Sequence, residues 1–496
     1  MRRTGLLLVA MLAFLPVLSA PLLGEGDATT AGAAGGGAPA ATPQPVQAGP
    51  EETSGAGQAA AGSEEARSQG TVARLRELFD AGKDQEVVAL GEEYLAKFPA
   101  DADARLLVAW SLTRQSATAK ATAYKRGLFH RAFNHLMAAQ QSDPSRLAVR
   151  VALMDVLYHL ERHDQLLTEA KSLLDERPGD EEAANEVGFY AEQYLRDGRP
   201  SRAVEVCRLL AAARPQNAQL LSNLGTTLIL AGNLDEGIAT LLRAEKLAPG
   251  DADTAHNLAQ AYLYQGDQAR ALEWFARTSK ARPESGRFLL DLAVVKAIAS
   301  PAEAAPLFDK AEEILGVSRA QKILVDGLRI GMTSPLLKSP DLDLLARDLH
   351  DTGYPVYALA ALEKLLHVEP ARLDATFLRA QILDENRFFQ RSLAEYRRAA
   401  SLAKGLPETE KEARMEEAIG GQARALTALG DAKAALDLLR STGKTERFIV
   451  LTAEALIVSG DLPGGLALME KAALSSDPQL GELARERLRE LSEGVP

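Results

Sequence analysis

Two histidines are the residues best spaced for chemistry in this chain. His159 and His163, within the stretch YHLERH, would stand one turn apart on a helix, where two imidazoles can share a metal ion. In the zinc-protease pattern Glu directly follows the first His, whereas here Leu160 follows it and Glu161 comes next. We therefore interpret both histidines as solvated residues near a helix end and expect no metal site.

Nucleotide binding and cysteine chemistry have equally weak signals. Gly443, Lys444 and Thr445 resemble the end of a phosphate loop, but Leu438 stands where the first glycine belongs, and a helical pattern precedes it. The single cysteine, Cys207, falls at an apolar position of its segment, which favours a buried packing residue over a nucleophile. The sequence therefore predicts a protein without catalytic activity and without a cofactor.

The composition favours a helical protein. The 496 residues are 46% hydrophobic and 25% charged, so the chain can bury more than one small core. Ala and Leu dominate, and both enter helices at a low cost in entropy. The formal net charge of −12 argues against a general nucleic-acid binder, because such a protein needs excess basic residues to contact phosphates.

The first residues have the layout of an export signal. Arg2 and Arg3 precede an apolar run that small residues follow, which predicts a signal peptide over residues 1–19. The alternative is an uncleaved inner-membrane anchor over residues 5–24. In both cases we expect the body of the protein to be exported, either periplasmic, secreted or membrane-anchored. Residues 20–70 are rich in Ala, Gly and Pro and poor in large apolar residues, which predicts a disordered linker.

The chain contains an internal repeat. Pro144 and Pro178 lie 34 positions apart, and the same spacing separates Pro215, Pro249 and Pro283. A period of this length indicates one supersecondary unit per repeat. Because each proline would stop a helix, the spacing predicts helices that end at regular intervals.

Within each unit the residues match two helices joined by a turn. In one unit Leu258, Ala259 and Tyr262 recur at helical spacing, and Gly266 can then take the left-handed conformation that ends a helix. Polar residues two positions after the prolines are good caps for the next helix, namely Asp101, Asp180, Asn217 and Asp251.

This pattern resembles the tetratricopeptide repeat family from about Val72 onward. The resemblance implies an all-α fold, a right-handed superhelical solenoid of about ten or eleven helix-turn-helix repeats. We expect an N-terminal array over residues 71–316, an irregular helical connector over 317–340, and a C-terminal array over 341–496. An amphipathic segment after Pro478 predicts a helix that caps the last repeat.

The resemblance also implies a binding surface, because in this family the first helix of each repeat lines a concave groove. The implied groove residues are Trp110, Arg114, Asp155, Tyr158, Asn185, Phe189, Ser222, Thr226, His256, Gln260 and Tyr264, with Asn223 and Asn257 where several peptide-binding members hold Asn. Aromatic and amide side chains suit extended peptides or sugars. We predict a cell-envelope scaffold that binds a partner protein or peptide. The alternatives are a polysaccharide-binding or polysaccharide-export component, and an enzyme with a site near residues 327–340.

One segment is basic although the whole chain is acidic. Residues 104–142 contain no Asp or Glu, and the candidate patch for an anionic partner comprises Arg114, Lys120, Lys125, Arg126 and Arg131. Local charge of one sign concentrates a partner of the opposite sign, here an acidic protein, an anionic polysaccharide or lipid head groups. The alternative is a solvated helix pair that acidic neighbours balance.

Overall fold

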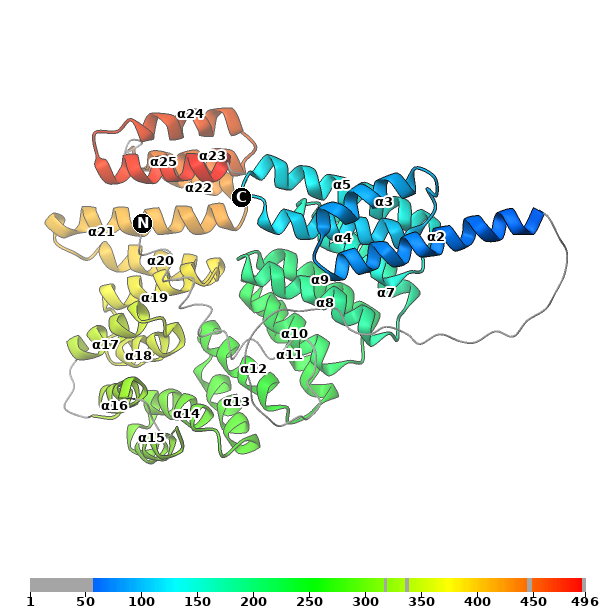
Figure 1. The fold of residues 1–496 in the computed structure, drawn as a ribbon. Coiled ribbons are helices and arrows are strands. Elements are labelled where there is room, and N and C mark those ends of the chain that lie inside the picture. Colours follow the sequence, from blue (N-terminus) through cyan, green and yellow to red (C-terminus); the bar gives the residue numbers. More distant parts are fainter. Residues whose placement is uncertain (1–56, 316–318, 335–338, 444–447, 493–496) are drawn as a thin grey trace. The chain divides into compact units, whose positions relative to one another are not determined.

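The fold consists of α-helices joined by short turns (Figure 1). A computed structural model describes residues 57–315, 319–334, 339–443 and 448–492, and no strand occurs among these residues. The predicted signal peptide over 1–19, the alternative anchor over 5–24 and residues 20–56 of the predicted linker lie outside the described residues. The helices are α2 (Gly57–Asp80), α3 (Asp84–Leu95), α4 (Ala102–Thr118), α5 (Thr122–Ser142), α6 (Leu147–His159), α7 (His163–Glu176), α8 (Glu181–Arg196), α9 (Pro200–Ala213), α10 (Ala218–Leu230), α11 (Leu234–Leu247), α12 (Ala252–Gln265), α13 (Gln268–Ala281), α14 (Gly286–Ala299), α15 (Pro301–Leu315), α16 (Arg319–Thr333), α17 (Ser339–Asp351), α18 (Pro355–Val368), α19 (Leu373–Glu385), α20 (Phe389–Ala403), α21 (Glu408–Ala428), α22 (Ala432–Ser441), α23 (Ile449–Val458), α24 (Leu462–Ala473) and α25 (Pro478–Ser492).

The predicted all-α repeat class is confirmed. Taken in chain order, the described helices form pairs from α2/α3 to α14/α15 and from α17/α18 to α23/α24, with α16 and α25 left over. Helix α25 packs its apolar residues Leu480, Ala484 and Leu488 onto the core of α23 and α24, as predicted for a capping helix.

The predicted helix caps and the predicted helix-ending glycine are also confirmed. A side-chain oxygen accepts a hydrogen bond from the backbone N–H three residues later at each of the four predicted caps, Asp101, Asp180, Asn217 and Asp251. Gly266 ends α12 with φ of 75°, in the left-handed region. These side chains satisfy backbone groups that a helix end leaves without a partner.

Helix α2 begins earlier than the predicted start of ordered structure at residue 71. Its first residue is Gly57, so residues 57–70 of the predicted disordered linker are helical. The stretch from Ala59 to Arg67 is rich in Ala and Glu, which favour a helix even where no large apolar side chain is available. Low hydrophobicity was therefore an insufficient criterion for disorder in this stretch.

The chain forms two compact units. The N-terminal unit comprises the described residues up to Asp197 together with Glu205–Arg214. The C-terminal unit comprises Gly198–Val204 and the described residues from Pro215 onward. The division thus passes through α9, and not through the predicted connector over 317–340.

The predicted connector is instead part of the C-terminal unit. Residues 319–333 form α16, which packs against α14, α15, α17 and α18. Leu328 and Met332 of α16 are buried, and one apolar core extends from Ile229 to Phe388. Because this core is continuous across residues 317–340, the chain does not divide there.

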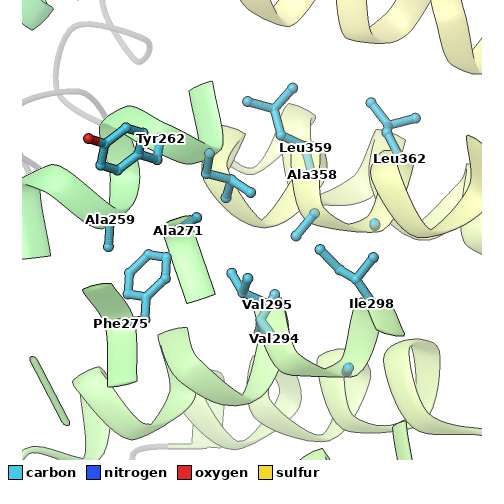
Figure 2. Packing of buried hydrophobic residues seen from close by; sticks show 14 of the residues in the cluster. Ala259, Tyr262, Ala271, Phe275, Val294, Val295, Ile298, Ala358, Leu359 and Leu362 are labelled. Carbon is cyan, nitrogen blue, oxygen red and sulfur yellow. The ribbon is translucent and has the colours of Figure 1, made fainter. Parts of the chain in front are cut away.

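Helix α18 closes back onto earlier helices of the C-terminal unit. It packs against α12 and α14 as well as against its neighbours α17 and α19. Figure 2 shows Ala358 of α18 facing Val295 and Ile298 of α14, all within the same buried cluster. The face that α12 and α14 would present to a ligand is therefore occupied by apolar side chains of the same unit.

Candidate partner-binding surfaces

In the C-terminal unit, the predicted groove residues of α10 and α12 are buried. Ser222, Asn223, Thr226, His256 and Asn257 all lie in the interior. The Nδ2 group of Asn257 donates to Oγ1 of Thr226 over 2.9 Å, so part of the predicted ligand surface is hydrogen-bonded within the protein. These five side chains are not accessible to a partner in this structure.

The hydroxyl of Ser222 is similarly committed to its neighbour. Its Oγ lies 2.9 Å from Oγ1 of Thr254, and both groups are buried. The amide of Gln219 donates to Oδ1 of Asn223 over 2.9 Å. Buried polar groups need such partners, so these contacts account for Ser222 and Asn223 without a ligand.

His256 lies at the centre of a buried polar cluster. Its Nδ1 is 3.6 Å from Oδ2 of Asp291 on α14, and its ring packs between Phe275 and Phe288. Tyr357 of α18 donates a 2.7 Å hydrogen bond to Oδ1 of Asp291. Asp291 therefore ties α18 to the helices it covers.

Burial shifts both ionisable members of this cluster. Burial, followed by the nearby Arg287 cation, lowers the pKa of His256 from 6.5 to about 3. Burial raises the pKa of Asp291 from 3.8 to about 6, against the opposing influence of Arg287 and the Tyr357 hydrogen bond. Both groups therefore favour their uncharged forms inside the unit.

The predicted groove residues at the end of α12 are covered by the α19–α20 turn. The ring of Tyr264 lies 4.6 Å from that of Phe388, and burial raises the pKa of Tyr264. A Cβ added to Gly232 would collide with the carbonyl oxygen of Arg387 in the same turn. Gln260 is partly buried on the same helix. Segments far apart in sequence thus close this face.

The corresponding face of the N-terminal unit remains open. Asn185 is exposed, and the Phe189 side chain is 45% exposed on the same helix, α8. Tyr158 of α6 is partly buried, and its hydroxyl donates to the Asp197 carboxylate. Trp110 is partly buried, with its ring 5.8 Å from that of Phe79. Tyr158 thus lies on α6, and Asn185 and Phe189 lie on α8, whose Tyr190 ring contacts that of Tyr158.

The predicted basic patch separates into two parts. Arg114 donates to the Asp84 carboxylate over 2.8 Å and lies 4.1 Å from the centre of the Phe79 ring. Arg131 pairs with Glu92 at 2.6 Å. Acidic neighbours therefore balance these two arginines, as the alternative interpretation expected.

The other three cations of the patch are unpaired. Lys120, Lys125 and Arg126 are exposed and form no ion pair with any described residue. They lie at or just before the first turn of α5, beside Tyr124, which is 60% exposed. Since a helix N-terminus is itself positive, this position concentrates positive charge.

The two histidines considered as metal ligands have other contacts. The His159 ring stacks on Phe129 at 4.7 Å, and Nδ1 of His163 lies 2.9 Å from the Tyr194 hydroxyl. The described residues contain no group of three His, Cys, Asp or Glu side chains that could hold a metal ion. None of the described helices has the length and apolar character needed to cross a membrane.

Two buried charged residues, Asp291 and Arg150, were not predicted from the sequence. Asp291 stands in the apolar run FLLDLAVV, where a lone acid is a detectable sign of a buried polar contact. Arg150 is 2% exposed and pairs with Glu169 at 2.5 Å and with Glu176 at 2.7 Å. Its partners lie 19 and 26 positions away, so helical spacing gives no sign of them.

Comparison with protein families identifies the repeats. Models described as tetratricopeptide repeat match residues 216–284, 256–315 and 420–441. The chain contains tetratricopeptide repeats. A comparison with curated proteins finds no match.

Several solved structures resemble this repeat protein at low identity. A tetratricopeptide repeat protein from Parabacteroides merdae is 18% identical, with 48% of this chain and 98% of that chain covered and a TM-score of 0.30. YrrB, described as a repeat protein with an unusual peptide-binding site, is 18% identical, with coverage of 38% and 97% and a TM-score of 0.30. Naa15/Naa10 bound to HypK-THB is 14% identical, with coverage of 86% and 78% and a TM-score of 0.31.

Proposed function

We propose that this tetratricopeptide repeat protein is a non-catalytic interaction scaffold that binds a partner protein or peptide on the open face of α6 and α8. The repeats themselves support a protein-interaction role. The observation that carries the proposal is the exposed Phe189 on the same helix as exposed Asn185, at repeat positions whose counterparts Ser222, Thr226 and His256 in the C-terminal unit are buried. An exposed aromatic side chain among polar groups is a common anchor of protein interfaces.

A substitution on this face tests the proposal. Full-length wild type and the Phe189→Ser variant are used as bait in extracts of the native cells, and bound proteins are quantified by mass spectrometry. Loss of an interface anchor should lower recovery of the specific partner about tenfold. The matched control is Leu344→Ser, which removes a 63% exposed apolar side chain from α17. Equal recovery by wild type and Phe189→Ser would exclude this face as the binding site.

We further propose that the protein acts in the cell envelope after removal of residues 1–19. The arginines and apolar run at the start of the sequence support export. Mass spectrometry of the native protein should find an N-terminal peptide that begins near Ala20. A peptide that retains residues 5–24, recovered from the membrane fraction, would favour the anchored alternative.

Binding of an anionic polysaccharide is a second candidate function. The three unpaired cations beside exposed Tyr124 favour it, because they offer charge together with a ring on which a sugar can stack. Polygalacturonate should bind wild type, with an affinity that falls as salt is raised. Reversal of Lys120, Lys125 and Arg126 to Glu should abolish this binding, and uncharged dextran is the control ligand. Retention by the triple variant would reject the polysaccharide site.

A further inference from the structure

The open face of the N-terminal unit has a charge character that the groove residues alone do not show. Burial raises the pKa of the Tyr190 hydroxyl, and the negative charges of Asp155 on α6 and Glu186, one turn before Tyr190 on α8, raise it further. The two helices also meet directly, since the Tyr158 and Tyr190 ring centroids are 5.9 Å apart.

These two carboxylates lack a permanent cation. Asp155 is 3.7 Å from Nε2 of His159, which carries charge only when protonated. Glu186 forms no ion pair with a described residue, and the neighbouring Glu182 repels it. Partial removal from water raises the pKa of both carboxyl groups. A carboxylate in this position is stabilised when a cation approaches it.

Aromatic side chains complete the surface around these acids. Phe189 is exposed and lies edge-on to Tyr190, with ring centroids 5.4 Å apart. The Tyr158 ring also lies next to that of Tyr190, with centroids 5.9 Å apart. A cation is attracted to the face of an aromatic ring, and the aliphatic stem of Lys or Arg can pack on the same ring. Carboxylates and rings therefore favour the same kind of ligand.

We propose that the α6–α8 face, defined by Asp155, Tyr158, Asn185, Glu186 and Phe189, binds a basic peptide segment through its Lys or Arg side chains. This inference rests on the proposed scaffold function and specifies the chemistry of the partner. Glu181 and Glu182 at the exposed start of α8 add negative charge to the same helix. The occupant is thus complementary in charge to the surface.

Peptide binding to the full-length protein tests this inference. The probe is a fluorescent twelve-residue peptide of alternating Lys and Leu, compared with the same peptide in which every Lys is acetylated. Fluorescence anisotropy at low salt should show tighter binding of the unmodified peptide. The double variant Asp155→Asn/Glu186→Gln should weaken that binding about tenfold while leaving the acetylated peptide unaffected.

A matched variant separates local recognition from the charge of the whole chain. Glu408→Gln/Glu410→Gln on α21 removes the same two negative charges from exposed positions in the C-terminal unit. It should leave binding unchanged. Equal weakening by the two double variants, or equal affinity for the two peptides, would overturn the inference. Circular dichroism melting of each variant verifies that the repeats remain folded.

Two further outcomes separate this inference from the proposal on which it rests. If Phe189→Ser abolishes capture of the native partner and Asp155→Asn/Glu186→Gln does not, the scaffold proposal stands and the basic-peptide assignment fails. If sedimentation shows self-association that reversal of Lys125 and Arg126 abolishes, the occupant is a second copy of this chain. That result would also overturn the peptide assignment.

Discussion

The same repeat position has opposite environments in the two units. Asn185 in α8 corresponds by repeat spacing to Ser222 in α10 and His256 in α12. Asn185 is exposed, whereas Ser222 and His256 are 5% and 1% exposed. The repeat pattern is alike in the two units, so the pattern does not determine whether the face is available. At His256 a distant helix, α18, packs on the repeat, and its Tyr357 bonds the neighbouring Asp291.

In the C-terminal unit the covering segment is α18 together with the α19–α20 turn. Tyr357 reaches Asp291 with a hydrogen bond, and Lys364 donates to the carbonyl oxygen of Ala297 over 3.3 Å at the end of α14. Phe388 covers Tyr264. These contacts make the closed face part of the structural core of this unit.

The largest expected effect comes from truncation of the covering helix. Leu362 of α18 is fully buried, so Leu362→Ala should cost about 2–5 kcal/mol of unfolding free energy through lost burial and a cavity. Hydrogen exchange should accelerate in α12, α14 and α18 and remain unchanged in α4 to α6. Leu474→Ala, at an 88% exposed side chain, is the control and should change stability little. Unchanged exchange in α12 would show that α18 does not stabilise the closed face.

His256 and Asp291 should each make the stability of the C-terminal unit depend on pH, in opposite directions. The lowered pKa of His256 costs stability as pH falls from 6.5 towards 3, since the unfolded chain binds the proton more tightly. The raised pKa of Asp291 costs stability as pH rises from 3.8 to about 6. The two slopes oppose each other between pH 4 and 6, so wild type should show little net dependence from this pair.

Single substitutions should reveal each slope. Relative to wild type, His256→Gln should gain about 1 kcal/mol per pH unit as pH falls from 6 to 4. Asp291→Asn should gain a similar amount as pH rises over the same range. Urea unfolding at closely spaced pH values measures both differences. Parallel pH profiles for wild type and the two variants would contradict opposing titrations in this cluster.

Two glycines with similar backbone angles allow the stability cost of crowding the α19–α20 turn to be measured separately. Gly232 and Gly82 have φ of 86° and 71°, so alanine at either position costs about 1 kcal/mol for the left-handed conformation. A Cβ on Gly82 would meet no atom within 4 Å, whereas one on Gly232 would collide with Arg387. Gly232→Ala should therefore destabilise its unit by about 1–2 kcal/mol more than Gly82→Ala does. Equal losses would indicate that the α19–α20 turn moves away without cost.

The caps and turns within one repeat could be predicted from the sequence. The packing of α18 and the α19–α20 turn on earlier helices could not. Caps such as Asp251 and turns such as Gly266 depend on residues within one repeat, and the sequence displays both partners of each contact. The contact between Asp291 and Tyr357 joins residues 66 positions apart. The bending of a repeat array accumulates from small rotations between repeats, and repeat spacing does not encode them.

The candidate site shows the same limit. The family register assigned Asn185, Phe189, His256 and Asn257 to one groove, whereas the first two are exposed and the last two are buried. Asp155 and Glu186 can be assigned to one surface only from the structure, in which Tyr158 of α6 contacts Tyr190 of α8. Neighbouring acids in different repeats cannot be recognised from a one-repeat pattern.

The smallest expected effect compares alanine at equivalent positions of the two faces. Ser222→Ala removes the hydroxyl beside the buried Thr254 Oγ1 and should cost about 1 kcal/mol, because that oxygen loses its partner. Asn185→Ala should change stability by less than about 0.5 kcal/mol, because the side chain is exposed and Ala favours helix. Urea unfolding of each variant, with hydrogen exchange to assign the change to a unit, measures the difference. Equal costs at Asn185 and Ser222 would mean that the α8 face is covered in solution as the α10 face is, and the open surface proposed for partner binding would be lost.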